Sequence, residues 1–288
     1  MRCLMPLLTV TLLVLGVLVA SCRSQDEADA PPSVAQLRVM TFNIRYGTAR
    51  DGAHAWPNRR ALVTERIRAS APDVLALQEG LAFQLEELSE VLRDYRKLGQ
   101  HREGGLEGEF SGLYVRNELD VLDTGEFWFS ETPEVPGSRS WDSSLPRMCA
   151  WVDVRPSAGA PAIRLYGTHY DHRGQVARTR STELVLDHSR GAERVVVMGD
   201  LNAREGDAPV AGYLDAGFRS AVLVADPDVS RGTMNAFRHE DGGRGRIDHV
   251  LVRGPLTVAS ASILGGRVNG LFPSDHDAVV ATLELMAP

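Results

Sequence analysis

The chain has 288 residues, of which 43% are hydrophobic and 24% are charged, and it carries a formal net charge of −7. This composition is typical of a globular protein with a sizeable core. The negative charge argues against broad, sequence-independent binding to nucleic acid, which needs a basic surface. It does not exclude a phosphorylated substrate, because a bound divalent metal can supply local positive charge.

The N-terminus has the features of a secretory signal. Arg2 is followed by an apolar run over residues 4–20, and then by the sequence VASC, which ends at Cys22. A basic start, a hydrophobic segment and small residues before a cleavage site are typical of an exported protein. VASC resembles the bacterial lipobox, in which the Cys is lipidated and becomes the mature N-terminus. We therefore predict a signal peptide over residues 1–21 and a lipid on Cys22. The alternative is a transmembrane anchor, because about 17 apolar residues are near the lower limit for a span.

The segment after Cys22 has the composition of a tether. Residues 22–36 are polar, acidic and contain prolines, which favours a flexible linker. By resemblance to Gram-negative sorting rules, an Asp directly after the lipidated Cys would favour the inner membrane, but residue 23 is Arg. We therefore expect an outer-membrane lipoprotein on the periplasmic or surface face, with its folded domain over residues 37–288. Cys149 is the one cysteine of that domain, so no intrachain disulfide is available there, and its apolar surroundings predict a buried hydrophobe.

Hydrophobic periodicity, with Gly and Pro between segments, predicts alternating strands and helices. Strands are expected at residues 37–44, 72–79, 111–116, 121–129, 148–155, 162–171, 194–200, 246–253, 256–264 and 277–285. Helices are expected at residues 57–70, 82–94 and 175–189. Residues 99–111 and 130–147 show little regular pattern, which is typical of functional loops. We predict one α/β domain in which sheets stack face to face, with helices outside.

Residues with carboxylate, carboxamide or imidazole side chains recur where the predicted strands end or begin. They are Asn43, Glu79, His169, Asp171, Asp200, Asn202, Asp248, Asp275 and His276. Ligand sites gather outside the carboxyl ends of strands, and residues two apart on an extended chain point the same way. His169 with Asp171, and Asp200 with Asn202, can therefore each face one cleft.

These residue types suit a hard cation. Mg²⁺ takes oxygen ligands and keeps several waters, so one or two carboxylates and a substrate phosphate are enough. The sequence has no Cys cluster and no HExxH motif, which argues against zinc. Histidines among carboxylates suit a general base or donors to a transition state. Each motif alone is weak, since GDLN by itself is more typical of a polar turn.

Taken in order, the segments TFNIRY, LALQE, THYD, GDLN, RIDHVL and SDHDAV resemble the endonuclease/exonuclease/phosphatase superfamily, with its DNase I-like fold. The resemblance runs from about Leu37 to Leu285. It implies a four-layer α/β sandwich with two packed mixed β-sheets flanked by helices. It also implies Mg²⁺- or Mn²⁺-assisted hydrolysis of a phosphomonoester or phosphodiester by in-line attack of water.

The resemblance also implies roles for the residues that would bind the metal and the attacking water. Glu79 resembles the principal metal carboxylate, assisted by Asn43, and Asp275 resembles a second metal-side carboxylate. Asp200 resembles the group that orients or deprotonates the attacking water. Asn202, beside it, would hold the phosphate or the attacking oxygen.

The remaining catalytic roles fall to the histidines and their partners. His276 would contact the scissile phosphate or act as the base, with Asp248 as the carboxylate that fixes its tautomer. His169 would donate to a phosphate oxygen from the other side. Glu109 precedes Arg116 by seven residues, a spacing that in the DNase I branch belongs to a Glu that orients the strand-end His. We therefore expect Glu109 to orient His169; the alternative is an exposed loop carboxylate.

The substrate is the least determined part. The stretch 127–151 and the segment DHRGQVARTR resemble a bacterial branch grouped with deadenylase- and nocturnin-like members. Arg147 and Arg178 are candidate phosphate clamps, because guanidinium binds phosphate bidentately. The alternative for Arg178 is an ion pair with Glu183. Asp171 is expected to bind substrate beside them.

The leading hypothesis is a metal-dependent phosphoesterase of the cell envelope, monomeric and tied to the membrane through its lipid alone. Its substrate would be a phosphorylated small molecule, a lipid headgroup or a single-stranded nucleic acid. One alternative is a secreted nuclease that scavenges nucleic acid. The other is a non-catalytic binding lipoprotein on the same fold, which would predict gaps among the ligand residues.

Overall fold

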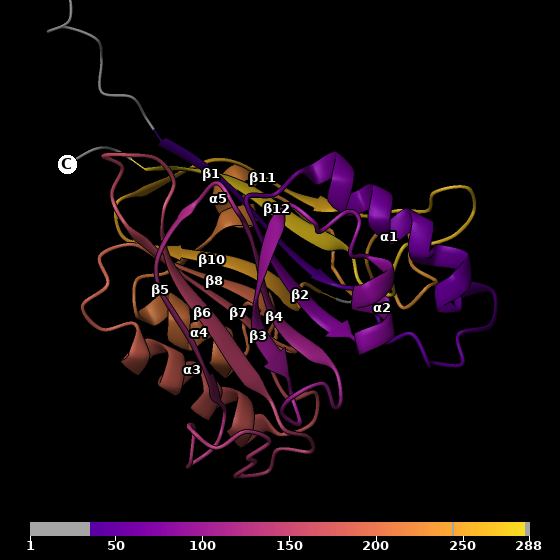
Figure 1. Ribbon diagram of the computed structural model, residues 1–288, viewed down its shortest axis with the longest axis horizontal. Coiled ribbons are helices and arrows are strands. Elements are labelled where there is room, and N and C mark those ends of the chain that lie inside the picture. The colour runs from indigo at the N-terminus through magenta and orange to yellow at the C-terminus, as the bar shows by residue number, and fades with distance from the viewer. Residues whose placement is uncertain (1–34, 244, 286–288) are drawn as a thin grey trace, which may run out of the picture. The chain divides into compact units, whose positions relative to one another are not determined.

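The computed structural model describes residues 35–243 and 245–285 (Figure 1). The predicted signal peptide, Cys22 and most of the tether lie outside the described residues. Strand β1 (Ala35–Asn43) begins two residues before the expected domain boundary at Leu37. Within the described ranges, no helix is both long and apolar enough to cross a membrane.

The first sheet has six strands in the order β11-β12-β1-β2-β4-β3. Besides β1, its strands are β2 (Val74–Gly80), β3 (Tyr95–His101), β4 (Phe110–Arg116), β11 (Leu256–Leu264) and β12 (Ala278–Leu285). Strands β1 and β2 are parallel, and the other neighbours are antiparallel. The parallel pair brings the carboxyl ends of β1 and β2 to the same edge.

The second sheet has six strands in the order β5-β6-β7-β8-β10-β9. They are β5 (Asp120–Trp128), β6 (Met148–Arg155), β7 (Ile163–His169), β8 (Val195–Asp200), β9 (Arg219–Ser220) and β10 (Asp248–Arg253). Strands β7 and β8 are parallel and the rest antiparallel. Because His169 and Asp200 are register partners at the ends of the parallel pair, their side chains start from adjacent positions.

The sheets pack face to face, and helices cover their outer faces (Figure 1). Helices α1 (Trp56–Ser70) and α2 (Ala82–Glu87) cover the first sheet. Helices α3 (Gln175–His188) and α4 (Ala208–Asp215) cover the second. A 3-10 turn η2 (Gly52–His54) precedes α1, and a short helix α5 (Ala221–Ala225) follows β9. The predicted four-layer sandwich with two mixed sheets is confirmed.

The apolar run of β8 shows how the sequence fits this architecture. Val196 and Met198 belong to the core between the sheets, whereas Val195 and Val197 belong to the core beneath α3 and α4. All four side chains are fully buried. A strand with both faces covered needs a continuous hydrophobic run, and β8 has one.

Some elements differ from the sequence-based expectation. Strand β3 occupies part of the segment that was expected to be irregular, and it forms a hairpin with β4. Its sequence YRKLGQH is polar because it is an edge strand, so the hydrophobic pattern is weak. Helix α2 ends at Glu87, and turns replace the rest of the helix expected to reach residue 94. Helices α4 and α5 were not predicted.

Candidate active site

A cleft of about 550 Å³ lies where the ends of β1, β2, β7 and β8 meet. The predicted site residues that line it are Glu79, Glu109, Arg147, His169, Asp200, Asn202, Asp275 and His276. It is completed by Arg45, Tyr46, Arg102, Leu145, His172 and Met234. Residues predicted from motifs scattered along the chain therefore share one cavity, of a size typical for small-molecule sites.

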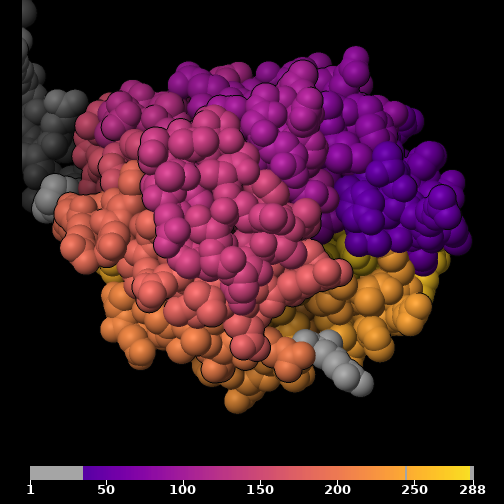
Figure 2. Space-filling model, turned by 90° about the horizontal axis from the view of Figure 1, so that it is seen from below, coloured from indigo at the N-terminus to yellow at the C-terminus, as the bar shows by residue number. Residues whose placement is uncertain are grey.

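Segments distant in sequence come together near this cleft. The ring of His54 is stacked on Phe237, with centroids 4.5 Å apart. In Figure 2 the indigo segment that follows β1 lies beside orange and yellow segments from the last third of the chain. A larger hollow, of about 660 Å³, lies between the starts of α3 and α4. No His lines that hollow, so the chemistry belongs to the smaller cleft.

Asn43 connects two carboxylates of the site. Its Nδ2 donates to Glu79 Oε1 at 2.9 Å and to Asp200 Oδ2 at 3.1 Å. Its Oδ1 accepts the backbone N–H of Arg45 at 3.0 Å. Exchanging the amide oxygen and nitrogen would set oxygen against both carboxylates, so this orientation is strongly preferred. In this arrangement the side chain of Asn43 acts as a donor that joins Glu79 to Asp200, and its predicted part in metal binding stays a prediction.

Glu79 enters the cleft through a β-bulge. The pairing of β2 with β4 shifts register between Gln78 and Gly80, and Glu79 has a φ of 64°. A non-glycine residue in this left-handed region is strained, and such strain concentrates at functional sites. The bulge directs the carboxylate to the cleft, where Oε2 accepts the backbone N–H of Tyr46 at 3.1 Å.

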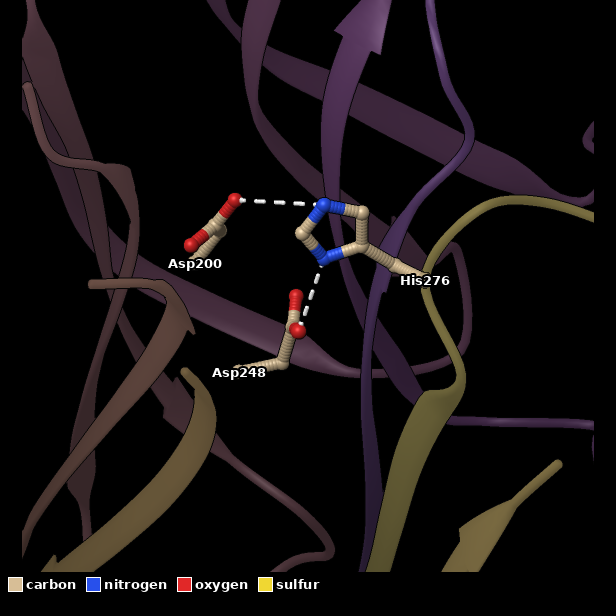
Figure 3. Close-up of side chains that lie close together, drawn as sticks. All are labelled: Asp200, Asp248 and His276. Atoms are coloured by element: carbon tan, nitrogen blue, oxygen red, sulfur yellow. Dashed lines mark hydrogen bonds and ion pairs between the residues drawn. The ribbon is translucent and has the colours of Figure 1, made fainter. Parts of the chain in front are cut away.

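His276 lies between two buried carboxylates (Figure 3). Its Nδ1 is 2.8 Å from Asp248 Oδ2, and its Nε2 is 3.9 Å from Asp200 Oδ2. Burial alone would lower the pKa of His276, but the charges of Asp248 and Asp200 outweigh it and hold the pKa well above its ordinary value. Nδ1 thus faces Asp248, the partner that the resemblance implies, and the two carboxylates favour the protonated ring.

Asp200 is the centre of the carboxylate cluster. Burial raises the pKa of Asp200 to about 6, and the charge of Asp248 adds to the effect. Its Oδ2 lies 3.5 Å from Nε2 of His169. Burial, with the nearby charge of Arg147, holds the pKa of His169 well below its ordinary value, so this imidazole is neutral. The surroundings of the two histidines thus differ: nearby carboxylates favour the protonated form of His276, whereas burial and Arg147 favour the neutral form of His169.

The GDLN turn has strict backbone requirements. Gly199 has a φ of 155°, and a Cβ there would lie 2.0 Å from the carbonyl oxygen of Thr168. Asn202 has a φ of 47°, and its backbone N–H donates to Asp200 Oδ1 at 2.9 Å. Its Nδ2 donates to the carbonyl of Tyr170 at 3.1 Å. The amide of Asn202 is thereby fixed at the edge of the cleft beside Asp200.

Asp275 has a partner that the sequence did not reveal. Its Oδ2 is 3.5 Å from Nη1 of Arg45, and Arg45 also binds Asp51. Burial raises the pKa of Asp275, and the charge of Glu79 raises it further. Arg45 follows Asn43 by two residues. Its position next to a strand-end site residue was the feature of the sequence that could have identified it.

Glu109 has a partner other than the expected one. Its Oε2 is 2.5 Å from Nη1 of Arg102, and among the described residues it makes no hydrogen bond to His169. Instead, the carboxylate nearest to the His169 ring is that of Asp200. The predicted orientation of His169 by Glu109 is thus corrected, although Glu109 lies in the cleft. Arg102 comes from a segment without regular pattern, so no sequence signal marked it.

Asp171 holds loops together and does not line the cleft. Its two oxygens accept hydrogen bonds from Ser144, Leu145, Arg173 and Gly174, at distances from 2.7 to 3.2 Å. A carboxylate with this many donors has no free direction for a substrate. The predicted substrate contact by Asp171 is corrected to a structural role, in which it ties the 130–147 loop to the start of α3.

The two candidate arginines have different positions. Arg147 is 5% exposed, lines the cleft, and has Nη2 3.3 Å from Nδ1 of His172. Arg178 lines the hollow between α3 and α4, and its Nη1 donates to the carbonyl of Asp171 at 2.9 Å. The structure therefore keeps Arg147 at the site and removes Arg178 from it. The carboxylate of Glu183 pairs with Arg180, not with Arg178.

Two groups of oxygen donors could hold a cation. Ligand atoms of Asp200, Asp248 and His276 lie within 4.8 Å of one another. In this group Nδ1 of His276 already faces Asp248 Oδ2 at 2.8 Å, so the same residues also suit proton transfer. The second group is at Glu79, whose charge raises the pKa values of Asp200, Asp275 and Glu109 after the larger effect of their burial. A divalent cation bound among these carboxylates would relieve their mutual repulsion, so they are a suitable set of ligands for it.

Comparisons with known proteins agree with this geometry. A model described as the Endonuclease/Exonuclease/phosphatase family matches residues 40–276. A solved structure of an endonuclease/exonuclease/phosphatase family protein from Bacteroides thetaiotaomicron is 27% identical, with a TM-score of 0.80, covering 89% of this chain and 100% of that one. A mannosyl-6-phosphatase from Bacteroides thetaiotaomicron VPI-5482 is 28% identical, with a TM-score of 0.78, covering 86% and 99%.

A more distant structure shares the fold. TDP2 from D. rerio, in complex with a single-strand DNA product, is 20% identical, with a TM-score of 0.69, covering 86% of this chain and 99% of that one. The match of the family model over most of the described domain, together with the two stacked mixed sheets, establishes the relationship. The chain belongs to the endonuclease/exonuclease/phosphatase family, whose members are phosphoester hydrolases with the DNase I-like fold.

Proposed function

We propose that this protein hydrolyses a phosphate ester with the help of Mg²⁺ or Mn²⁺. The observation that carries the proposal is the position of His276 between the buried carboxylates of Asp248 and Asp200, in a cleft that also contains Glu79. A cationic donor beside a carboxylate of raised pKa suits a reaction in which a phosphoryl group gains charge while a water loses a proton. The similarity to a mannosyl-6-phosphatase supports this reaction class.

The metal would be held on the first-sheet side of the cleft. Glu79 is the principal candidate ligand, because it lines the cleft and its oxygens each have only one hydrogen-bond donor. Asp275 is the second candidate ligand, and the nearby guanidinium of Arg45 partly neutralises its carboxylate. A bound Mg²⁺ or Mn²⁺ would supply Lewis-acid stabilisation of the phosphoryl charge.

The chain's own residues account for binding and proton transfer. His276 is held with Nδ1 on Asp248, which leaves Nε2 to donate to a phosphate oxygen in the cleft. Asp200 is the nearest carboxylate to both histidine Nε2 atoms, and it can accept the proton of the attacking water. Asn202 and Asn43 keep Asp200 in place by donating to different oxygens of its carboxylate.

A substrate panel tests this proposal. The full chain should be assayed with Mg²⁺ and with Mn²⁺ on nitrophenyl phosphate esters, mononucleotides, oligonucleotides, sugar phosphates and lipid headgroups. We expect Asp200→Asn and His276→Ala each to remove most of the activity, roughly 100-fold or more, without unfolding the domain. The exposed Asp187→Asn is the matched control. Full activity in both site variants would overturn the mechanism, and cleavage of oligonucleotides alone would favour a secreted nuclease.

We further propose that the protein acts in the cell envelope, as a monomer anchored through Cys22. The support is the sequence alone: the apolar run over residues 4–20, the VASC motif and the Arg at position 23. Metabolic labelling with a radioactive fatty acid tests the anchor. Label should enter the protein and should be absent from the Cys22→Ser variant. Equal labelling of both would contradict the lipid anchor.

A further inference from the structure

One end of the active-site cleft is closed. The residues at this end are Arg102, Glu109, Arg147 and His169, all of which also line a narrow compartment behind them. That compartment has no volume for a water molecule. A substrate group that reaches this end must therefore stop there.

The closed end contains more guanidinium donors than protein acceptors. Nε of Arg147 is buried without a hydrogen-bond partner among the described residues; its nearest carboxylate oxygen, on Asp171, is 3.9 Å away. Nε of Arg102 is likewise buried and makes no hydrogen bond there, with Glu103 Oε1 at 3.5 Å outside bonding geometry. Glu109 neutralises one of the two charges through Arg102. Within the described ranges, Arg147 keeps a donor without an acceptor, because Asp171 is 3.9 Å away and its oxygens accept hydrogen bonds from loop N–H groups and Ser144.

Burying a guanidinium without a full set of hydrogen-bond acceptors costs free energy, unless a bound anion supplies the missing acceptors. Burial, with the nearby charge of Arg102, lowers the pKa of Arg147 against the opposing charges of Glu109, Asp171 and Glu79. Because the side chain lines the cleft, the missing acceptor can come from a ligand.

The cleft continues at a different end. Asn202 and Met234 also line a second hollow of about 400 Å³, whose other walls are Arg204, Asp207, Ala236, His239 and Ile247. This set shares no residue with the closed end. The cleft thus has room for a bulky group beyond Met234 and none beyond Arg147.

We propose that the cleft takes a phosphomonoester end-on, with its terminal phosphate against Arg147 and Arg102 and its esterified group extending past Met234. This inference rests on the proposed function and specifies its substrate class. A monoester has three terminal oxygens and two negative charges near neutral pH, which suit the guanidinium donors that lack an acceptor in the described part of the closed end. An internal phosphodiester has a second esterified group, for which the closed end has no space, and it lacks the second charge.

Two chromogenic esters with the same leaving group test the proposal. The full chain, with Mg²⁺, should be assayed on p-nitrophenyl phosphate and on bis-p-nitrophenyl phosphate. We expect kcat/KM for the monoester to be at least about tenfold higher. Arg147→Gln should lower the monoester kcat/KM by roughly 10- to 100-fold and the diester kcat/KM by less than about threefold. The exposed Arg180→Gln on α3 is the matched control and should change neither value.

The outcomes separate the two proposals. If the wild-type protein cleaves the diester faster than the monoester, the end-on inference is overturned while the hydrolase proposal stands. An equal loss on both esters in Arg147→Gln would also overturn it, because Arg147 would then contact the phosphate of a diester as well, for which the inference leaves no space at the closed end. If Arg147→Gln does not fold, the wild-type ratio still decides. If no ester of the larger panel is cleaved, the proposed function itself fails.

Discussion

Asn43, at the end of a strand in the first sheet, donates a hydrogen bond of 3.1 Å to Asp200, at the end of a strand in the second. The site is therefore assembled across the sheet–sheet interface. The same amide nitrogen binds Glu79, so one uncharged side chain sets the spacing of two carboxylates that repel each other. Any substrate phosphate or metal between them depends on how the two sheets pack.

Removing this connection should damage both stability and activity. In Asn43→Ala, Glu79 and Asp200 lose a shared donor while Asp200 remains buried and Glu79 partly buried. We expect the free energy of unfolding to fall by roughly 1–3 kcal/mol and kcat/KM to fall by about 100-fold. Urea denaturation and ester hydrolysis measure the two effects. The exposed Asn58→Ala should change neither substantially, and activity within about threefold of wild type in Asn43→Ala would show that the bridge does not position the site.

The bulge at Glu79 makes a prediction about backbone strain. Glu79→Gly and Glu79→Ala both remove the carboxylate, but only Gly adopts a φ of 64° without penalty. We therefore expect Glu79→Gly to be more stable than Glu79→Ala by about 1 kcal/mol, with both variants inactive. The same pair at Glu65, exposed in α1, should give the opposite order, because Ala is favoured in a helix by about 1 kcal/mol. Equal stability of the two Glu79 variants would mean that the bulge relaxes.

The fold was largely predictable, because most strands are buried on at least one face. β8 and β12 have near-continuous apolar runs, and the order of motifs implied two stacked sheets. The edge strand β3 was not predictable, because its exposed residues carry no hydrophobic pattern. The early end of α2 reflects local turns that the amphipathic pattern after Glu87 did not reveal.

The position of a polar residue in the cleft was predictable where it lies at the carboxyl end of a strand, as with Asp200 and Glu79. The pairing of side chains was not predictable, because it depends on the distances between segments that lie far apart in the sequence. Glu109 binds Arg102 and Asp171 binds loop N–H groups, and both are carboxylates that could equally have faced a histidine or a substrate. Arg178 lies only about one turn along α3 from the site-side loop, yet it lines another hollow.

The pairing of Asp248 with His276 should control catalysis. In Asp248→Asn the ring loses the charge that fixes its tautomer and keeps it cationic. We expect kcat to fall by roughly 100- to 10,000-fold with little change in KM, because the shape of the cleft is kept. Steady-state kinetics on the best substrate of the panel gives both values, and circular dichroism checks the fold. The exposed Asp215→Asn is the control, and a loss confined to KM would assign Asp248 to binding.

Asp171 makes the stability of the 130–147 loop dependent on pH. Burial alone would raise the pKa of Asp171, but hydrogen bonds from Gly174, Ser144 and Arg173 outweigh it and hold the pKa well below its ordinary value. A carboxyl with a depressed folded-state pKa adds stability that is fully present above the unfolded-state pKa of about 3.9 and is lost as the pH falls towards the folded-state pKa.

Asp171→Asn should therefore be less stable than wild type by roughly 3 kcal/mol at pH 7, where the charged acceptor is lost, and the gap should narrow below about pH 4. Urea denaturation of both proteins from pH 7 to pH 3 measures the gap directly, and other carboxyls that titrate in both proteins largely cancel in the difference. Asp187→Asn, which removes an exposed carboxylate paired with Arg190, should show no such gap. A constant difference across the whole range would mean that the charge of Asp171 contributes nothing, and that its shape alone holds the loop.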